Sequence, residues 1–60
     1  MASFELFKGK DGQYYWRLRS GNGQIVATGG EGFKDKSGAG NGIASVQRDA
    51  AAANVVDLTG

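Results

Sequence analysis

The segment Tyr14–Arg19 constrains the fold of this chain more than any other. It holds the only tryptophan and both tyrosines. Its residues alternate between two faces, with Tyr14, Trp16 and Leu18 on one and Tyr15, Arg17 and Arg19 on the other. Turn signals lie on either side, at Gly9–Gln13 and at Gly21–Gly23. The segment is therefore predicted to be the middle strand of a three-stranded antiparallel meander.

A partner strand is predicted on each side of this segment. Phe4–Lys8 alternates in the same way, and the pair Asp11-Gly12 favours a turn because glycine accepts positive φ without steric cost. Gln24–Thr28 is the third strand. It follows Asn22-Gly23, a pair that favours a type I′ hairpin turn.

A helix and a last strand are predicted after residues 29–32, which are rich in glycine and break the strand pattern. Asp35 or Ser37 is expected to cap the helix start, and Ala50–Ala53 extends the helix towards a stop at Asn54. The apolar positions Ala39, Ile43, Val46 and Ala50 share one helical face. Asn54–Thr59 then reads as a short strand. The predicted fold class is α+β, in the order strand, strand, strand, helix, strand.

Three glycines, Gly38, Gly40 and Gly42, lie within the predicted helix. Each costs a helix interior roughly 0.8–1 kcal/mol relative to alanine. The expected compensation is a close approach of the helix backbone to the sheet, or, for Gly38, a position in a loosely formed first turn.

The length predicts a single domain, residues 1–60, with a marginal core. A chain of this size buries only about 60% of its unfolded surface, and small domains of this kind use disulfides, metals or oligomerisation to become stable. The sequence has no cysteine and no histidine. Disulfides and Cys/His zinc sites are therefore excluded, and a homodimer is expected.

The second face of the sheet supports the same expectation. If Phe4, Leu6, Trp16 and Leu18 meet the helix, the other face carries two aromatic rings, and either Ile25 or Val26, among polar side chains. A solvated face should be mainly polar, so another subunit is expected to cover it. The residues predicted for this partner or dimer surface are Phe7, Tyr15, Arg17, Arg19 and Val26.

No catalytic, cofactor-binding or metal-binding residue is predicted. The common general base and the best nucleophile are missing, and Ser20, Ser37 and Ser45 have no activating neighbour. Gly30–Ser37 has the length of a phosphate-binding loop, but Asp35 stands where the motif requires glycine. We therefore expect an interaction module and not an enzyme.

A second function stays open, because Tyr15, Arg17 and Arg19 resemble a stacking platform for single-stranded nucleic acid. The competing interpretation is that Tyr15 is an interface aromatic and the arginines pair with a carboxylate such as Glu5. The formal net charge of +1 favours the competing interpretation. No segment is long and apolar enough to span a membrane, and no signal peptide precedes the first strand, so a cytoplasmic location is expected.

Several segments carry a resemblance to a known family, in this order along the chain: Phe4–Lys8, Trp16–Leu18, Asn22–Ile25, Glu31–Phe33 and Asn41–Val46. The chain resembles the YegP-like family of small bacterial proteins, and the match extends to the ending Val56–Thr59. The resemblance implies an α+β domain of the order given above, no known catalytic activity, and members that carry one or two copies of the unit. A member with one copy, such as this chain, would then be expected to pair with itself.

Overall fold

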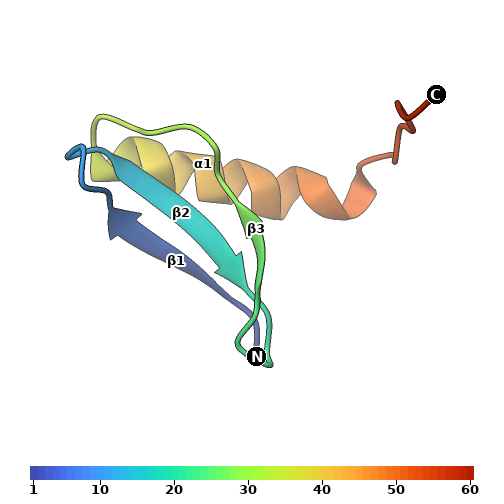
Figure 1. The fold of residues 1–60 in the computed structure, drawn as a ribbon, viewed down its shortest axis with the longest axis horizontal. Coiled ribbons are helices and arrows are strands. Elements are labelled where there is room, and N and C mark those ends of the chain that lie inside the picture. Colours follow the sequence, from blue (N-terminus) through green and yellow to red (C-terminus); the bar gives the residue numbers. More distant parts are fainter.

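Three antiparallel strands form one sheet, and one helix lies across it, in the computed structural model that describes all 60 residues (Figure 1). The strands are β1 (Ser3–Lys8), β2 (Tyr14–Arg19) and β3 (Ile25–Thr28), in the sheet order β1-β2-β3. The helix α1 covers Lys36–Asp49 and continues as a single 3₁₀ turn, η1 (Ala50–Ala52). The predicted middle strand and the α+β class are confirmed.

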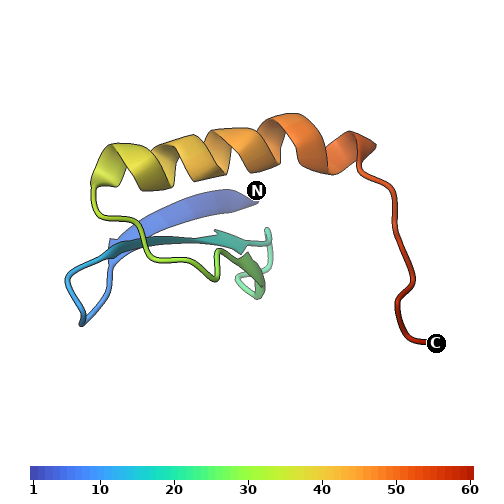
Figure 2. The same ribbon diagram turned by 90° about the horizontal axis from the view of Figure 1, so that it is seen from above.

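The register of the sheet fixes which residues share a face. Leu6 lies opposite Trp16 and Phe7 lies opposite Tyr15 in the pairing of β1 with β2. Side chains alternate along each strand. Trp16 and Leu6 therefore face α1, while Tyr15 and Phe7 point away from it. Figure 2 shows α1 on one face of the sheet, with nothing over the other.

Both hairpins use the same turn, which differs from the type I′ turn predicted for the second hairpin. In each, the fourth turn residue is a glycine with positive φ, 82° at Gly12 and 93° at Gly23, and its amide bonds to the carbonyl three residues earlier, at 3.0 and 2.9 Å. No other residue has positive φ, which excludes the predicted type I′ turn at Asn22-Gly23. The pattern fits a type I turn followed by a glycine bulge. The side chains of Asp11 and Asn22 accept the amides of Gln13 and Gln24 and support it.

The segment between β3 and α1 remains attached to β2. The amide of Gly29 donates to the carbonyl of Trp16 at 2.9 Å, and Tyr14 and Phe33 exchange two backbone hydrogen bonds at 2.8 and 2.9 Å. The glycine-rich residues between them break the strand, as predicted. Phe33 is thereby placed under the start of α1, where Asp35 caps the helix by accepting the Gly38 amide at 2.7 Å.

The core is small and centres on Trp16. Only Trp16 and Ala39 are buried among the 60 residues. The Phe4 ring meets the indole edge-on at 5.7 Å between centroids. A Cβ added at Gly42 would lie 3.3 Å from the indole nitrogen and 3.1 Å from Phe33, whereas one added at Gly40 would meet nothing. The predicted close approach of the helix backbone is therefore confirmed at Gly42 and wrong at Gly40.

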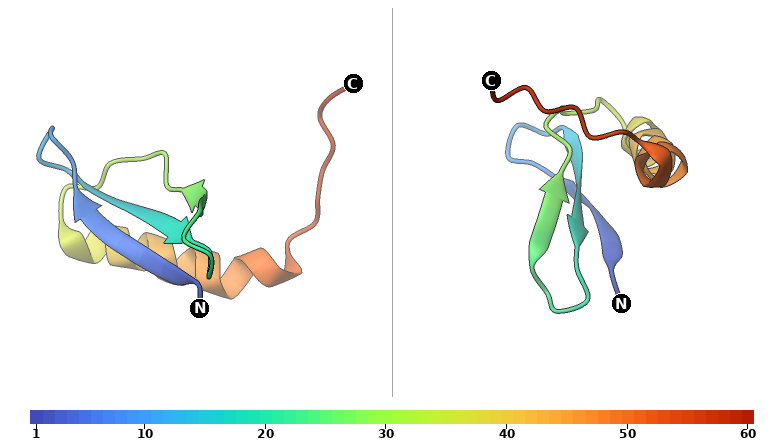
Figure 3. Two further views of the ribbon diagram at one scale, coloured as in Figure 1. Left: turned by 60° about the horizontal axis from the view of Figure 1, so that its bottom comes forward. Right: turned by 90° about the vertical axis from the view of Figure 1, so that its right-hand side faces the viewer.

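The predicted last strand over Asn54–Thr59 is absent from the single chain. Residues 53–60, which we call the tail, form no helix or strand and project away from the sheet (Figure 3). A strand forms only against a partner strand, and the end of α1 carries the tail beyond the edges of the sheet. Val55, Val56 and Leu58 remain 97%, 71% and 88% exposed. Ala50 was predicted to lie on the packed helix face. It is exposed, because the end of the helix extends beyond the sheet.

The third strand adds little to the core. Ile25 is 49% exposed and Val26 is 58% exposed, so neither packs under the helix. An irregularity in the pairing between Leu18 and Arg19 sets Ala27 opposite Leu18 and Ile25 opposite Arg19. The apolar side chains of β3 therefore remain available at the edge of the sheet.

Replacing Trp16 by alanine is expected to unfold most of the protein at room temperature. Removing a buried aromatic side chain costs about 3–5 kcal/mol, which is comparable to the whole stability of a small domain. Far-ultraviolet circular dichroism during a thermal melt measures the effect. A cooperative melt near that of the parent protein would show that the indole is not the centre of the core.

The helix glycines offer a matched pair of substitutions. Gly40→Ala is expected to stabilise the protein by roughly 0.8–1 kcal/mol, because alanine is the better helix former and its Cβ meets open space. Gly42→Ala has the same helix propensity gain but must displace Phe33 or Trp16. We expect it to gain clearly less, or to lose stability, in chemical denaturation. Equal gains at the two positions would contradict the close contact at Gly42.

Candidate interaction surfaces

The uncovered face of the sheet carries an aromatic stack. We call the side chains of Glu5, Phe7, Tyr15, Arg17 and Arg19 the outer face. The rings of Phe7 and Tyr15 stack with centroids 5.9 Å apart and planes at 22°. The Arg17 guanidinium lies 4.8 Å from the Phe7 centroid, within the range of a cation–π contact. Both rings thus have a partner within the chain.

Glu5 pairs with both arginines of the outer face. Its carboxylate accepts from Arg17 Nε at 2.7 Å and from Arg19 Nε at 3.2 Å. Cross-strand alternation brings these residues together, because Glu5 lies opposite Arg17 in the register. The hydrogen bond from Arg17 is the main cause that holds the pKa of Glu5 below its ordinary value, with the Arg19 hydrogen bond adding to it. The predicted pairing of the arginines with Glu5 is confirmed.

Tyr15 extends the network to the first hairpin. Its hydroxyl donates to the Asp11 carboxylate. This hydrogen bond lowers the pKa of Asp11 and raises the pKa of Tyr15 above the ordinary value, because the phenol is held as a donor. Four of the five residues predicted for a partner surface therefore lie in one continuous network. The fifth, Val26 on β3, takes no part in these stacking and ionic contacts.

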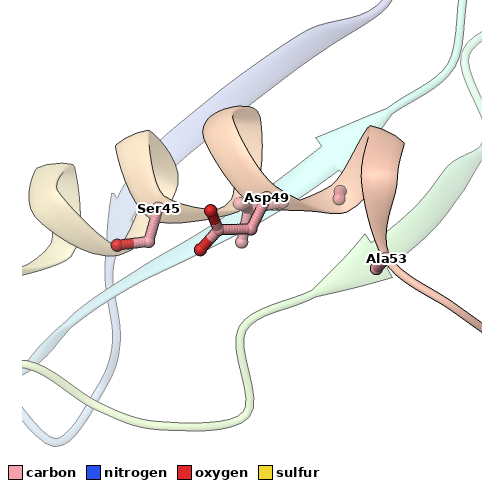
Figure 4. Close-up of a pocket in the computed structure, with 5 residues that line it drawn as sticks. Ser45, Asp49 and Ala53 are labelled. Atoms are coloured by element: carbon pink, nitrogen blue, oxygen red, sulfur yellow. The ribbon is translucent and has the colours of Figure 1, made fainter.

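A second surface lies at the far end of α1, and it was not predicted as a surface. Ser45, Val46, Asp49, Ala50 and Ala53 line an open hollow of about 270 Å³ (Figure 4). The tail leaves the helix at this hollow, so the exposed Val55, Val56 and Leu58 begin within a few residues of it. Helical periodicity indicated that Val46 and Ala50 share a face, but not that the sheet stops short of them.

No three aspartate, glutamate, histidine or cysteine side chains lie together as metal ligands. Hydrogen bonds lower the pKa values of Glu5, Asp11 and Asp57. None of these three carboxyl groups is therefore held protonated as a general acid. No helix is long and apolar enough to cross a membrane. What the surface presents is one paired polar-aromatic face and one uncovered apolar segment.

Comparison with known proteins agrees with this fold. Residues 10–57 match the family model described as a domain of unknown function, DUF1508. A UPF0339 protein of Treponema denticola is 40% identical over 57 residues, covering 95% of this chain and 97% of that protein. The solution structure of a Haloferax volcanii protein has a TM-score of 0.88 and 45% identity, with 93% of each chain covered. The solution structure of ATU0232 from Agrobacterium tumefaciens has a TM-score of 0.78 and 35% identity, with 98% of this chain and 94% of that one covered.

This chain belongs to the UPF0339 family and contains the DUF1508 domain, and the resemblance to the YegP-like family is confirmed. UPF0339 protein YegP of Yersinia pestis is 43% identical over 47 residues. The match covers 78% of this chain but only 41% of YegP, whereas nearly all of the Treponema protein is covered. The family thus contains proteins of about the length of this chain and proteins nearly twice as long.

Acid is expected to remove the contribution of Glu5 to stability. Since the pKa of Glu5 is lowered in the folded protein, its contribution is present above the ordinary glutamate pKa of about 4.3 and is lost as the pH falls through the folded value. Glu5→Gln should therefore melt below the parent at neutral pH, and the two melting temperatures should converge at about pH 2.

Glu31→Gln is the matched control, because Glu31 forms no ion pair. The gap between this control and the parent should remain small at neutral pH. A gap for Glu5→Gln that is the same at neutral and at acid pH would show that its ion pairs do not stabilise the fold.

Proposed function

We propose that this chain is a non-enzymatic interaction module that works as a homodimer, in which each copy covers the tail of the other. The observation that carries the proposal is the exposure of Val55, Val56 and Leu58 in a protein with two buried residues. Burying an aliphatic side chain of this size contributes about 1.5–3 kcal/mol. Burying three such side chains per copy would add a large share to the stability of a small domain.

Exchange of the tail is the form of pairing that we favour. The tail has the alternation of a strand but finds no partner strand in its own chain. The outer edges of β1 and β3 are unpaired, and a sheet edge accepts an added strand. Exchanging a terminal element between identical copies is a low-cost route to a dimer. The predicted last strand would then form only in the pair.

The outer face is the other candidate for the dimer surface. Its rings stack on each other and its arginines share Glu5, so its groups are already partnered within the chain. The tail has no such partners. We therefore rank the tail above the outer face as the surface that needs a second copy. The predicted cytoplasmic location is part of the proposal.

Association is expected to be coupled to folding. The melting temperature should rise with protein concentration, because unfolding of a dimer releases two chains. Sedimentation equilibrium should give about twice the chain mass of 6.2 kDa. A compact monomer at high micromolar concentration, with a melt independent of concentration, would falsify the proposal.

Matched substitutions distinguish the two surfaces. Val56→Lys with Leu58→Lys places charges in the tail and should shift the sedimentation equilibrium to the monomer. Val26→Lys places a single lysine on β3, at a valine that is 58% exposed against 71% for Val56, and should weaken the dimer less. The reverse pattern would assign the interface to the sheet, including Val26, and would remove the role of the tail.

Single-stranded nucleic acid is the second candidate ligand, bound through Tyr15, Arg17 and Arg19. The pairing of both arginines with Glu5 leaves little free charge for phosphates, so we expect weak or no binding of labelled oligonucleotides. Fluorescence anisotropy at increasing salt measures it. Submicromolar affinity at physiological salt that is lost in Arg17→Ala/Arg19→Ala would reverse the ranking of the two candidates.

A further inference from the structure

The end of the chain is weakly held from Ala50 onward. The regular helix ends at Asp49, and the last hydrogen bond of η1 runs from the Ala53 amide to the Ala50 carbonyl at 3.2 Å. No residue after Asp49 is buried. Segments with few buried contacts and exposed backbone hydrogen bonds open at low free-energy cost. The tail and η1 therefore open together more easily than any strand.

The tail is also an exposed segment without helix or strand, which is the kind of segment that proteases cleave. Its hydrogen bonds are local, from the Thr59 amide and hydroxyl to the Asp57 carboxylate. Its backbone makes no hydrogen bond to the sheet or to α1. Exposed segments of this kind are preferred sites of cleavage. The small apolar residues Ala51–Ala53, Val55 and Val56 fit proteases that cleave after such side chains.

We propose that the end of the chain couples its lifetime to its assembly: unpaired chains are cleaved in η1 or in the tail, and pairing protects both. This inference rests on the proposed homodimer. Pairing would add strand hydrogen bonds and bury the apolar side chains at the same segment that the single chain exposes. Proteolysis of one state draws the equilibrium towards that state, so an excess of unpaired chains would be removed.

Limited digestion with elastase, which cleaves after small apolar residues, tests the inference on the full chain. The dimer dissociation constant is first measured by sedimentation. The cleavage rate per chain is then followed by mass spectrometry at protein concentrations tenfold above and tenfold below that constant, with elastase held constant and not saturated. The unpaired fraction rises from about one fifth to about six sevenths over this range, so the rate should rise about fourfold. First cuts should fall between Ala51 and Val56.

The tail variant Val56→Lys/Leu58→Lys is the control, because Ala51–Ala53 and Val55 remain as cleavage sites. Its rate should be high and the same at both concentrations. A parent protein that sediments as a dimer, yet is cut at the same rate per chain at both concentrations, would overturn this inference and leave the homodimer standing. First cuts within the strands would also overturn it. A monomer at every concentration would remove the proposed function and this inference with it.

Discussion

The contact between the Trp16 indole and two glycine backbones is the constraint on which the rest of the fold depends. Gly42 brings α1 against one part of the indole, and a Cβ added at Gly29 would lie only 2.5 Å from the indole nitrogen. Two glycine backbones thus lie close to the nitrogen of the largest side chain of the protein, and the Phe4 ring meets the indole edge-on. This arrangement lets a chain of 60 residues bury a tryptophan with very little other apolar material. The entropic cost of glycine in the helix falls at Gly42, where Phe33 and Trp16 leave little room for a side chain.

The two faces of the sheet solve the problem of exposure differently. On the helix side, Trp16 is covered by backbone. On the outer face no element covers the rings, and Phe7 and Tyr15 instead shield each other while Arg17 lies over Phe7. Arginine does this well because its flat guanidinium stacks on a ring and pairs with a carboxylate at once. Glu5 fixes the guanidinium in that position. The aromatic residues that suggested a missing partner are therefore largely accounted for within the chain.

Local patterns predicted most of this fold, and they failed where the outcome depends on what lies beyond the chain's own contacts. Alternation placed the strands and their faces, and the spacing of apolar residues with Asp35 placed the helix. The turn at Asn22-Gly23 was misassigned because the pair fits two hairpin geometries that differ in the φ of Asn22. The pairing of Glu5 with the arginines was predictable from register alone. The last strand was predicted from the alternation of Val56 and Leu58. Alternation alone does not determine which strand a segment pairs with, or whether that strand lies in the same chain.

The apolar tail finds no partner strand in its own chain. Under the proposed dimer, this gives the unit a physical reason to occur in pairs. Two copies as separate chains must meet, and the free energy of pairing then depends on concentration. Two copies joined in one polypeptide meet at an effective concentration that is commonly millimolar for a short linker. The same interface can therefore be weaker per contact in a joined protein than between separate chains. The family contains proteins of about the length of this chain and proteins nearly twice as long, a length that would fit two copies of the unit. Under the proposed pairing, a chain with one unit can bury its exposed tail only by binding a second chain.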